Sequence, residues 1–211
     1  MLIIGLTGGV ASGKTTVSQI LREEGAYLID ADRIARELVQ PHTPAWNELK
    51  KAFGNEILKE DGSLHRKRLA AKIYSGPKQR DLLNRILHPR IKAEMGRRMR
   101  EIGRKDPGAI VVIDAALIIE LGDHREMDKV IVVTSTETQQ IERLRDRNGM
   151  TPEEARRIIS AQMDLEEKLK VADFVIRNDG SFEDTKRKVK EIFQELKKIA
   201  LTKRPRALQK E

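Results

Sequence analysis

The 211-residue sequence contains no cysteine, few aromatic residues and no long hydrophobic run. Without cysteine, disulfide bridges and thiolate metal sites are excluded. No apolar stretch approaches the ~20 residues that a membrane-spanning helix needs. Aromatic residues make up only 3% of the chain and are scattered, whereas proteins that bind single-stranded nucleic acid stack bases on aromatic side chains. We therefore expect a cytoplasmic protein with no membrane and no nucleic acid among its partners.

Charge is abundant and unbalanced toward the basic side. The chain has 41 Lys and Arg against 33 Asp and Glu, which leaves a formal net charge of +8. A positive surface attracts nucleic acid, membrane headgroups and phosphorylated small molecules alike. The scarcity of aromatics favours phosphate-bearing small ligands, and nucleic-acid binding through a basic tail at about 200–211 is kept as an alternative. The length fits a single α/β domain over residues 1–211.

Short apolar runs alternate with helical patterns along the chain. Five of these runs are expected to be buried strands, at residues 2–6, 27–29, 110–113, 130–133 and 174–176. Parallel neighbouring strands need a crossover connection, which is usually a helix. The pattern predicts an α/β fold with a five-stranded parallel sheet and helices on both faces.

Helix signals are clearest late in the chain. Thr151 and Pro152, followed by Glu154, form a capping-box start, and we expect that helix to run to about Leu169. A second helix is expected over 182–199. Between the second and third strands, helical periodicity is broken at Pro41, Pro44, Gly62, Gly76-Pro77 and Pro89. We interpret about 41–106 as an inserted helical region that holds a second substrate, with the core at about 1–40 and 107–199.

One motif carries most of the functional information. Residues 8–15 read GGVASGKT, the pattern of a phosphate-binding P-loop, between an apolar strand and a helix. Lys14 is expected to reach the β- and γ-phosphates of a nucleoside triphosphate, and Thr15 to bind Mg²⁺. A glycine-rich turn with a surface lysine would not require this full pattern. The residues expected to bind the nucleotide are Gly8, Gly9, Val10, Ala11, Ser12, Gly13, Lys14, Thr15 and Thr16.

Carboxylates follow two predicted strands. Asp30 and Asp32 come after the second strand, and Asp114 after the third. Ligands of open parallel sheets lie outside the carboxyl ends of the strands. A carboxylate there can accept a proton from an attacking hydroxyl or hold Mg²⁺. The alternative is that these residues cap helices.

Basic residues after the fourth strand form a second candidate group. Arg143 and Arg147 are four residues apart, so they share one helix face and could neutralise charge on a transferred phosphoryl group. The alternative is a solvated helix face. His88 is isolated in the inserted region, and on composition alone it suits a structural role.

Several segments together resemble the dephospho-CoA kinase family. Besides the P-loop, these are residues 6–9 (LTGG), 29–32 (IDAD), 88–91 (HPRI), 117–120 (LIIE) and 172–178 (ADFVIRN). The resemblance covers the chain in order to about Ile199. It implies a nucleoside-monophosphate-kinase-like P-loop NTPase fold with a helical CoA domain and a lid at about 143–165. It also implies ATP-dependent phosphorylation of the ribose 3′-hydroxyl of dephospho-CoA, the last step of coenzyme A synthesis.

The resemblance also implies residue roles. Asp32 would be the general base, with Asp30 left open as the alternative. Lys14 and Arg143 would stabilise the transferred phosphoryl group, and Thr15 and Asp114 would bind Mg²⁺. Arg147 and Asn178 would bind ATP. The acceptor would be bound by Asp32, His88, Leu117 and Glu120.

Besides nucleic-acid binding through the basic tail, two rival functions remain open at this point. A kinase for another nucleoside or nucleotide would share the core and lid. A GTPase-like switch would need a guanine-reading Asn/Thr-Lys-x-Asp segment, which the sequence lacks.

Overall fold

The computed structural model describes residues 1–74 and 76–203, so the expected basic tail lies outside the described residues from 204 onward. The chain forms two compact units. Unit 1 comprises Met1–Ile29 and the chain from Glu101 onward, and unit 2 comprises Asp30–Arg100. The boundaries of unit 2 thus differ from those expected for the inserted region. No helix of the described residues is long and apolar enough to cross a bilayer.

The sheet has five strands in the order β2-β3-β1-β4-β5. Their bounds are β1 Leu2–Gly8, β2 Tyr27–Asp30, β3 Ile110–Asp114, β4 Lys129–Thr134 and β5 Phe174–Arg177. β1 pairs in parallel with β3 and β4, and β4 pairs in parallel with β5. Every residue of β3 is buried, which explains why it reads as a continuous apolar run. The predicted five-stranded parallel fold is confirmed.

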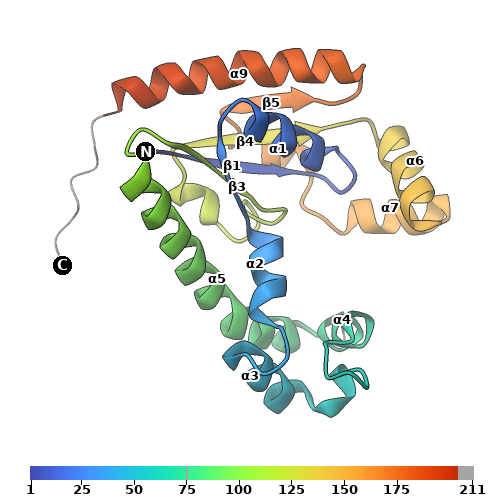
Figure 1. The fold of residues 1–211 in the computed structure, drawn as a ribbon. Coiled ribbons are helices and arrows are strands. Elements are labelled where there is room, and N and C mark those ends of the chain that lie inside the picture. Colours follow the sequence, from blue (N-terminus) through green and yellow to red (C-terminus); the bar gives the residue numbers. More distant parts are fainter. Residues whose placement is uncertain (75, 204–211) are drawn as a thin grey trace. The chain divides into compact units, whose positions relative to one another are not determined.

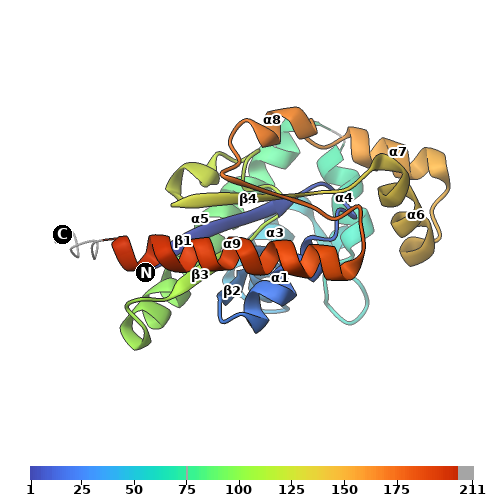
Figure 2. The ribbon, with the colours of Figure 1, turned by 90° about the horizontal axis from the view of Figure 1, so that it is seen from above.

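Helices α1 and α9 cover one face of this sheet (Figures 1 and 2). The helices of unit 1 are α1 Lys14–Glu23, α6 Glu137–Asn148, α7 Pro152–Ser160, α8 Leu165–Leu169 and α9 Phe182–Thr202. Leu21, Phe193 and Leu196 pack with the apolar side of β1 in one buried cluster. The last turn of α9 covers residues 200–202, which the sequence assigned to the tail.

The predicted helix from Thr151 to about Leu169 is wrong in its second half. The capping box at Thr151 and Glu154 is present, but α7 ends at Ser160. Asp164 then caps a new helix, α8, by accepting a hydrogen bond from Glu166 N at 2.8 Å. A side chain that satisfies amides of a new first turn competes with continuation of the old helix.

Unit 2 is helical. Its elements are α2 Ala31–Leu38, α3 Pro44–Phe53, the 3₁₀ helix η1 Asn55–Ile57, α4 Arg66–Tyr74 and α5 Pro77–Lys105, whose last turn continues into unit 1. Its small core is formed by Leu49, Phe53, Ile57, Leu69 and Ile86.

The break predicted at Pro89 is also wrong, because Pro89 lies inside α5. Proline removes one helical donor. Nearby, the carbonyl of Ile86 accepts a hydrogen bond from Arg90 Nη1 at 2.6 Å. This bond does not replace the donor lost at Pro89, which would have reached the carbonyl of Arg85, but the helix continues through the proline.

Candidate active site

The phosphate-binding loop connects β1 to α1 with its backbone in unusual conformations. Ala11 has φ 55° and Gly13 has φ 92°, both in the left-handed region. Gly13 is also the N-cap of α1, and no side chain of the described residues caps that terminus. The first amides of α1 are therefore available to an anion, which the helix dipole also favours.

Three consecutive carbonyl groups of the loop are held by side chains. Gln140 Nε2 donates to Val10 O at 2.9 Å, Arg143 Nη1 to Ala11 O at 3.0 Å and Asn178 Nδ2 to Ser12 O at 2.9 Å. A carbonyl that is held outside the loop turns the amide of the same peptide the other way, which favours inward amides at Ala11 and Gly13. The amide of Ser12 instead donates to Gly9 O at 3.1 Å. These contacts give the loop the form of an anion-binding site.

Asn178 is itself held on both sides of its amide. Its Oδ1 accepts a hydrogen bond from the buried Thr185 hydroxyl at 2.9 Å, which fixes Nδ2 toward Ser12 O. Its backbone N–H donates to Thr134 O at 2.7 Å, which places Asn178 directly after β5. The loop is therefore positioned from the neighbouring ends of β4 and β5.

Close packing explains two of the loop glycines. A Cβ atom on Gly13 would lie 1.8 Å from Asn178 Nδ2, and one on Gly8 would lie 2.5 Å from the backbone oxygen of Val133. At Gly13 the positive φ adds strain for any other residue. The motif glycines are thus required by the neighbouring strands as well as by the ligand.

Lys14 and Asp114 form an ion pair at the carboxyl edge of the sheet. Asp114 is buried at the end of β3, and Lys14 begins α1. The structure therefore brings together two residues that sequence analysis placed separately in the site. Thr15 is exposed at the same helix start and Thr16 is half-buried.

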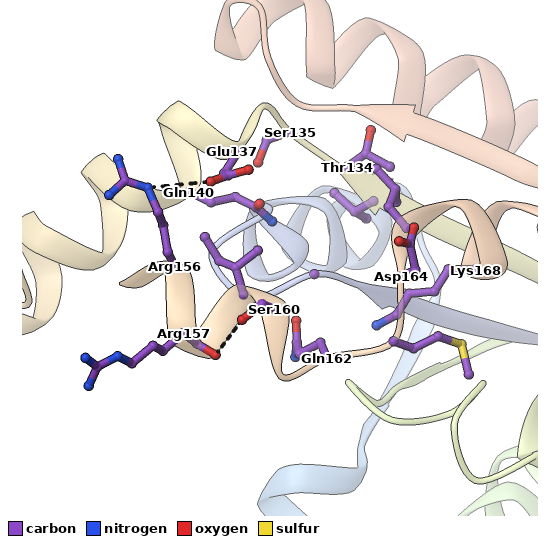
Figure 3. Close-up of a pocket in the computed structure, with 15 residues that line it drawn as sticks. Thr134, Ser135, Glu137, Gln140, Arg156, Arg157, Ser160, Gln162, Asp164 and Lys168 are labelled. Atoms are coloured by element: carbon purple, nitrogen blue, oxygen red, sulfur yellow. Dashed lines mark hydrogen bonds and ion pairs between the residues drawn. The ribbon is translucent and has the colours of Figure 1, made fainter. Parts of the chain in front are cut away.

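A pocket of about 780 Å³ lies beside the loop (Figure 3). Gly9 contributes from the loop, Thr134 from the end of β4, Gln140 from α6 and Lys168 from α8. The segment between α7 and α8 adds Gln162, whose Oε1 accepts a hydrogen bond from Val10 N at 2.7 Å. The Val10 residue is thus held at its N–H by Gln162 and at its carbonyl by Gln140.

Comparison with known proteins identifies the family. The family model described as dephospho-CoA kinase matches residues 2–184. The chain belongs to the dephospho-CoA kinase family. A dephospho-CoA kinase of Corynebacterium glutamicum is 45% identical over 196 residues, which covers 93% of this chain and 100% of the relative.

Solved structures agree with this family. A Thermus thermophilus protein aligns with a TM-score of 0.80 at 32% identity, covering 92% of this chain and 97% of the other. The dephospho-CoA kinase from Campylobacter jejuni aligns with a TM-score of 0.68 at 26% identity, covering 93% and 97%. The protein is thus a P-loop kinase of the dephospho-CoA kinase family.

The two predicted arginines of this dephospho-CoA kinase family member have different surroundings. Arg143 is half-buried, and besides Ala11 O it binds Asn178 O through Nη2 at 2.9 Å. Arg147 is exposed, and its Nε contacts its neighbour Asn148 at 3.1 Å. The structure therefore places Arg143 against the loop backbone, whereas it does not place Arg147 there.

Of the acceptor residues predicted from the dephospho-CoA kinase resemblance, two belong to unit 1. Leu117 is exposed in the segment after β3. Glu120 is half-buried and forms an ion pair with Lys168, with 2.7 Å between Oε1 and Nζ. Lys168 was not among the predicted residues, although it lines the pocket.

The other two predicted acceptor residues belong to unit 2. Asp32 is exposed in the first turn of α2, and His88 is half-buried on α5. Asp30 is the N-cap of α2, and its Oδ1 accepts a hydrogen bond from Arg33 N at 2.8 Å. Both candidate bases are exposed, and Asp30 has in addition a structural task as the cap of α2.

Proposed function

We propose that this protein transfers the γ-phosphoryl group of ATP to the ribose 3′-hydroxyl of dephospho-CoA, giving coenzyme A and ADP. The observation that carries the proposal is the loop whose three carbonyls are held outward, in a chain of the dephospho-CoA kinase family. We place this reaction, the last step of coenzyme A synthesis, in the cytoplasm.

Binding of ATP is the first step of the proposed reaction. The inward amides and the start of α1 receive the phosphates, and Lys14 reaches the β- and γ-phosphates. Arg143 contributes by fixing the loop, since both of its terminal nitrogens contact carbonyl oxygens. Residues 143–165, Arg147 among them, are proposed to act as a lid over ATP.

The transfer step needs a base for the acceptor hydroxyl. We assign this role to the Asp32 carboxylate, which takes the proton as the 3′-oxygen bonds to phosphorus and the bond to the ADP oxygen breaks. His88, Leu117 and Glu120 are proposed to contribute to the acceptor side. Asp30 keeps its role as the cap of α2.

The residues at the loop fit a magnesium ion. The Thr15 hydroxyl and the Asp114 carboxylate are oxygen donors, and Mg²⁺ in kinases takes one or two protein oxygens together with phosphate oxygens. When bound, the ion neutralises charge on the β- and γ-phosphates. We propose that Thr15 and Asp114 hold it, directly or through water.

The proposal is tested by a coupled ADP-release assay with ATP and Mg²⁺. The acceptors are dephospho-CoA, AMP, CMP and none, and the product is weighed by mass spectrometry. We expect turnover with dephospho-CoA alone and a product heavier by one phosphate. Turnover with AMP or CMP but not with dephospho-CoA would show that dephospho-CoA is not the acceptor. The protein would then be a P-loop kinase for another substrate.

A further inference from the structure

Lys168 carries an unusual buried charge. Only 1% of its side chain is exposed, although it lies on the short helix α8. Its ammonium group forms an ion pair with Glu120, but Nζ has no hydrogen bond of good geometry within residues 1–74 and 76–203. An ammonium has three donors, so this one keeps donor capacity that Glu120 does not use.

Such a pair needs an explanation beyond stability. Taking two charges out of water costs more than their attraction returns unless further hydrogen bonds satisfy them. Both carboxylate oxygens of Glu120 likewise have no hydrogen bond of good geometry in the described chain. The pair therefore holds an ammonium group in place without satisfying it.

The Lys168 side chain lines the pocket beside the loop. Figure 3 shows the Lys168 side chain pointing into this pocket toward Gln162. Gln162 contacts Val10 N, so Lys168 lies on the Gly9–Val10 side of the loop. Arg156 and Arg157 line the same pocket. The acidic lining residues have partners of their own: Glu137 Oε1 lies 3.8 Å from Nε of Arg156 in the same pocket, and Asp164 caps α8.

The position of the pocket suggests which phosphate it receives. The amides of the loop and of the start of α1 surround the inner phosphates. We place the nucleoside on the side of Asn178, a predicted ATP-binding residue that contacts the opposite end of the loop at Ser12. The Gly9–Val10 end then faces the terminal phosphate, which carries the most negative charge of the chain.

We propose that Lys168 binds the terminal phosphoryl group of ATP through its ammonium group, and that Glu120 is the positioning residue that aims it. Lys168 then neutralises charge on the group that is transferred. This inference rests on the proposed function, and it reassigns Glu120 from the acceptor to the positioning of Lys168.

The decisive experiment compares ligands with and without the terminal phosphate. Dissociation constants for ADP and for a non-hydrolysable β,γ-imido ATP analogue are measured by calorimetry with Mg²⁺. For Lys168→Met we expect analogue affinity to fall by about tenfold or more, because a charge-assisted contact is lost. ADP affinity should stay within about twofold of wild type, since ADP lacks the group.

Three further variants keep the test readable if Lys168→Met folds poorly. The double variant Lys168→Met/Glu120→Gln removes both buried charges, and we expect it to show the same selective loss. Lys170→Met removes an exposed lysine at the C-cap of the same helix and should bind both ligands like wild type. The single variant Glu120→Gln should weaken binding of the analogue more than binding of ADP, because the Lys168 ammonium group loses the carboxylate that positions it.

Three outcomes would overturn the inference. If binding of ADP and of the analogue were weakened equally, the Lys168–Glu120 pair would serve only the packing of α8. Unchanged affinity for both in the double variant would remove Lys168 from the ATP site. A rise confined to the KM for dephospho-CoA would assign it to the acceptor. Because the binding assay needs no acceptor, failure of wild type to phosphorylate dephospho-CoA would reject the proposed function and leave this result interpretable.

Discussion

The phosphate-binding loop of unit 1 and the helices of unit 2 are held by different kinds of contact. The loop is fixed by directional hydrogen bonds from Gln140, Arg143 and Asn178 to its own backbone. In unit 2, Arg98 joins α5 to α2 through Glu37 at 2.5 Å, on a partly exposed surface. Ion pairs of this kind are weak and are screened by salt. Each of these loop carbonyls thus has its own side-chain donor, whereas this contact between helices of unit 2 is an ion pair between side chains.

The largest expected effect separates chemistry from nucleotide binding. We predict that Asp32→Asn lowers kcat by about 10²–10⁴-fold, since a general base contributes that much. ATP affinity should be unchanged, because the loop contacts remain. Rapid-quench kinetics and ATP calorimetry measure the two quantities. Asp30→Asn is the matched control, because Asn caps helices as well as Asp does. If Asp30→Asn lost most of its kcat while Asp32→Asn stayed active, the role of general base would pass from Asp32 to Asp30.

A pair of glycine variants tests the comparison directly. Gly13 and Gly62 both have positive φ, but a Cβ on Gly62 would meet nothing within 4 Å. We predict that Gly13→Ala weakens ATP binding by about tenfold or more, since strain of about 1–2 kcal/mol is joined by displacement of Asn178. Gly62→Ala should cost similar strain in stability and leave ATP binding intact. If Gly13→Ala and Gly62→Ala bound ATP with equal affinity, the loop would have adapted to the added methyl group.

A smaller effect is expected at the outer support of the loop. Thr185→Val keeps the shape of the side chain but removes the donor to Asn178 Oδ1. We predict a loss of about 1–3 kcal/mol in the free energy of unfolding, because a buried amide oxygen loses its partner. ATP affinity should fall a few-fold. Thr202→Val on the same helix, where the exposed hydroxyl donates to the carbonyls of Lys198 and Ile199, is the control for urea denaturation.

The smallest effect concerns the ion pairs of unit 2. Hydrogen bonds from Arg97 and then Arg98 lower the pKa of Glu94 from 4.5 to about 2. A lowered carboxylate pKa stabilises the fold above pH 4.5, and this contribution disappears as the pH falls toward 2. We predict that Glu94→Gln lowers the free energy of unfolding at pH 7 by up to about 1 kcal/mol.

Its acid dependence provides the check. The difference between wild type and Glu94→Gln should shrink from pH 5 to pH 2, as measured by urea denaturation. Glu60→Gln, an exposed substitution in the same unit, is the charge-matched control. If the difference in unfolding free energy stayed constant over this pH range, it would not come from the ionised Glu94 carboxylate and its arginine partners.

Local signals explain what the sequence could predict. The apolar run of β1, the loop glycines and Lys14 are neighbours in the chain, so one window contains the whole strand-loop-helix unit. The end of α7 depended on a competing side chain, Asp164, that no periodicity reveals. The continuity of α5 through Pro89 was missed because an internal proline usually indicates a helix break. Asn178 was recognised through a family resemblance and not through its chemistry.

The supports of the loop were the least predictable part of the site. Gln140 and Gln162 are separated from Val10 by 130 and 152 residues. Glutamine has no distinctive pattern, and the need of a carbonyl for a donor appears only in three dimensions. One weak signal existed, because Gln140 lies one helical turn before Arg143 and shares its face.

The long separation between the loop and its supports has a consequence for the order of folding. Ser12 O depends on Asn178, which lies 166 residues further along the chain. During synthesis from the N-terminus, the motif emerges early but lacks these donors until β5 has been made. Closing such distant contacts is slow relative to local helix formation. The ability to bind a triphosphate should therefore appear late and together with completion of the sheet, so that nucleotide binding reports on whether the core has finished folding.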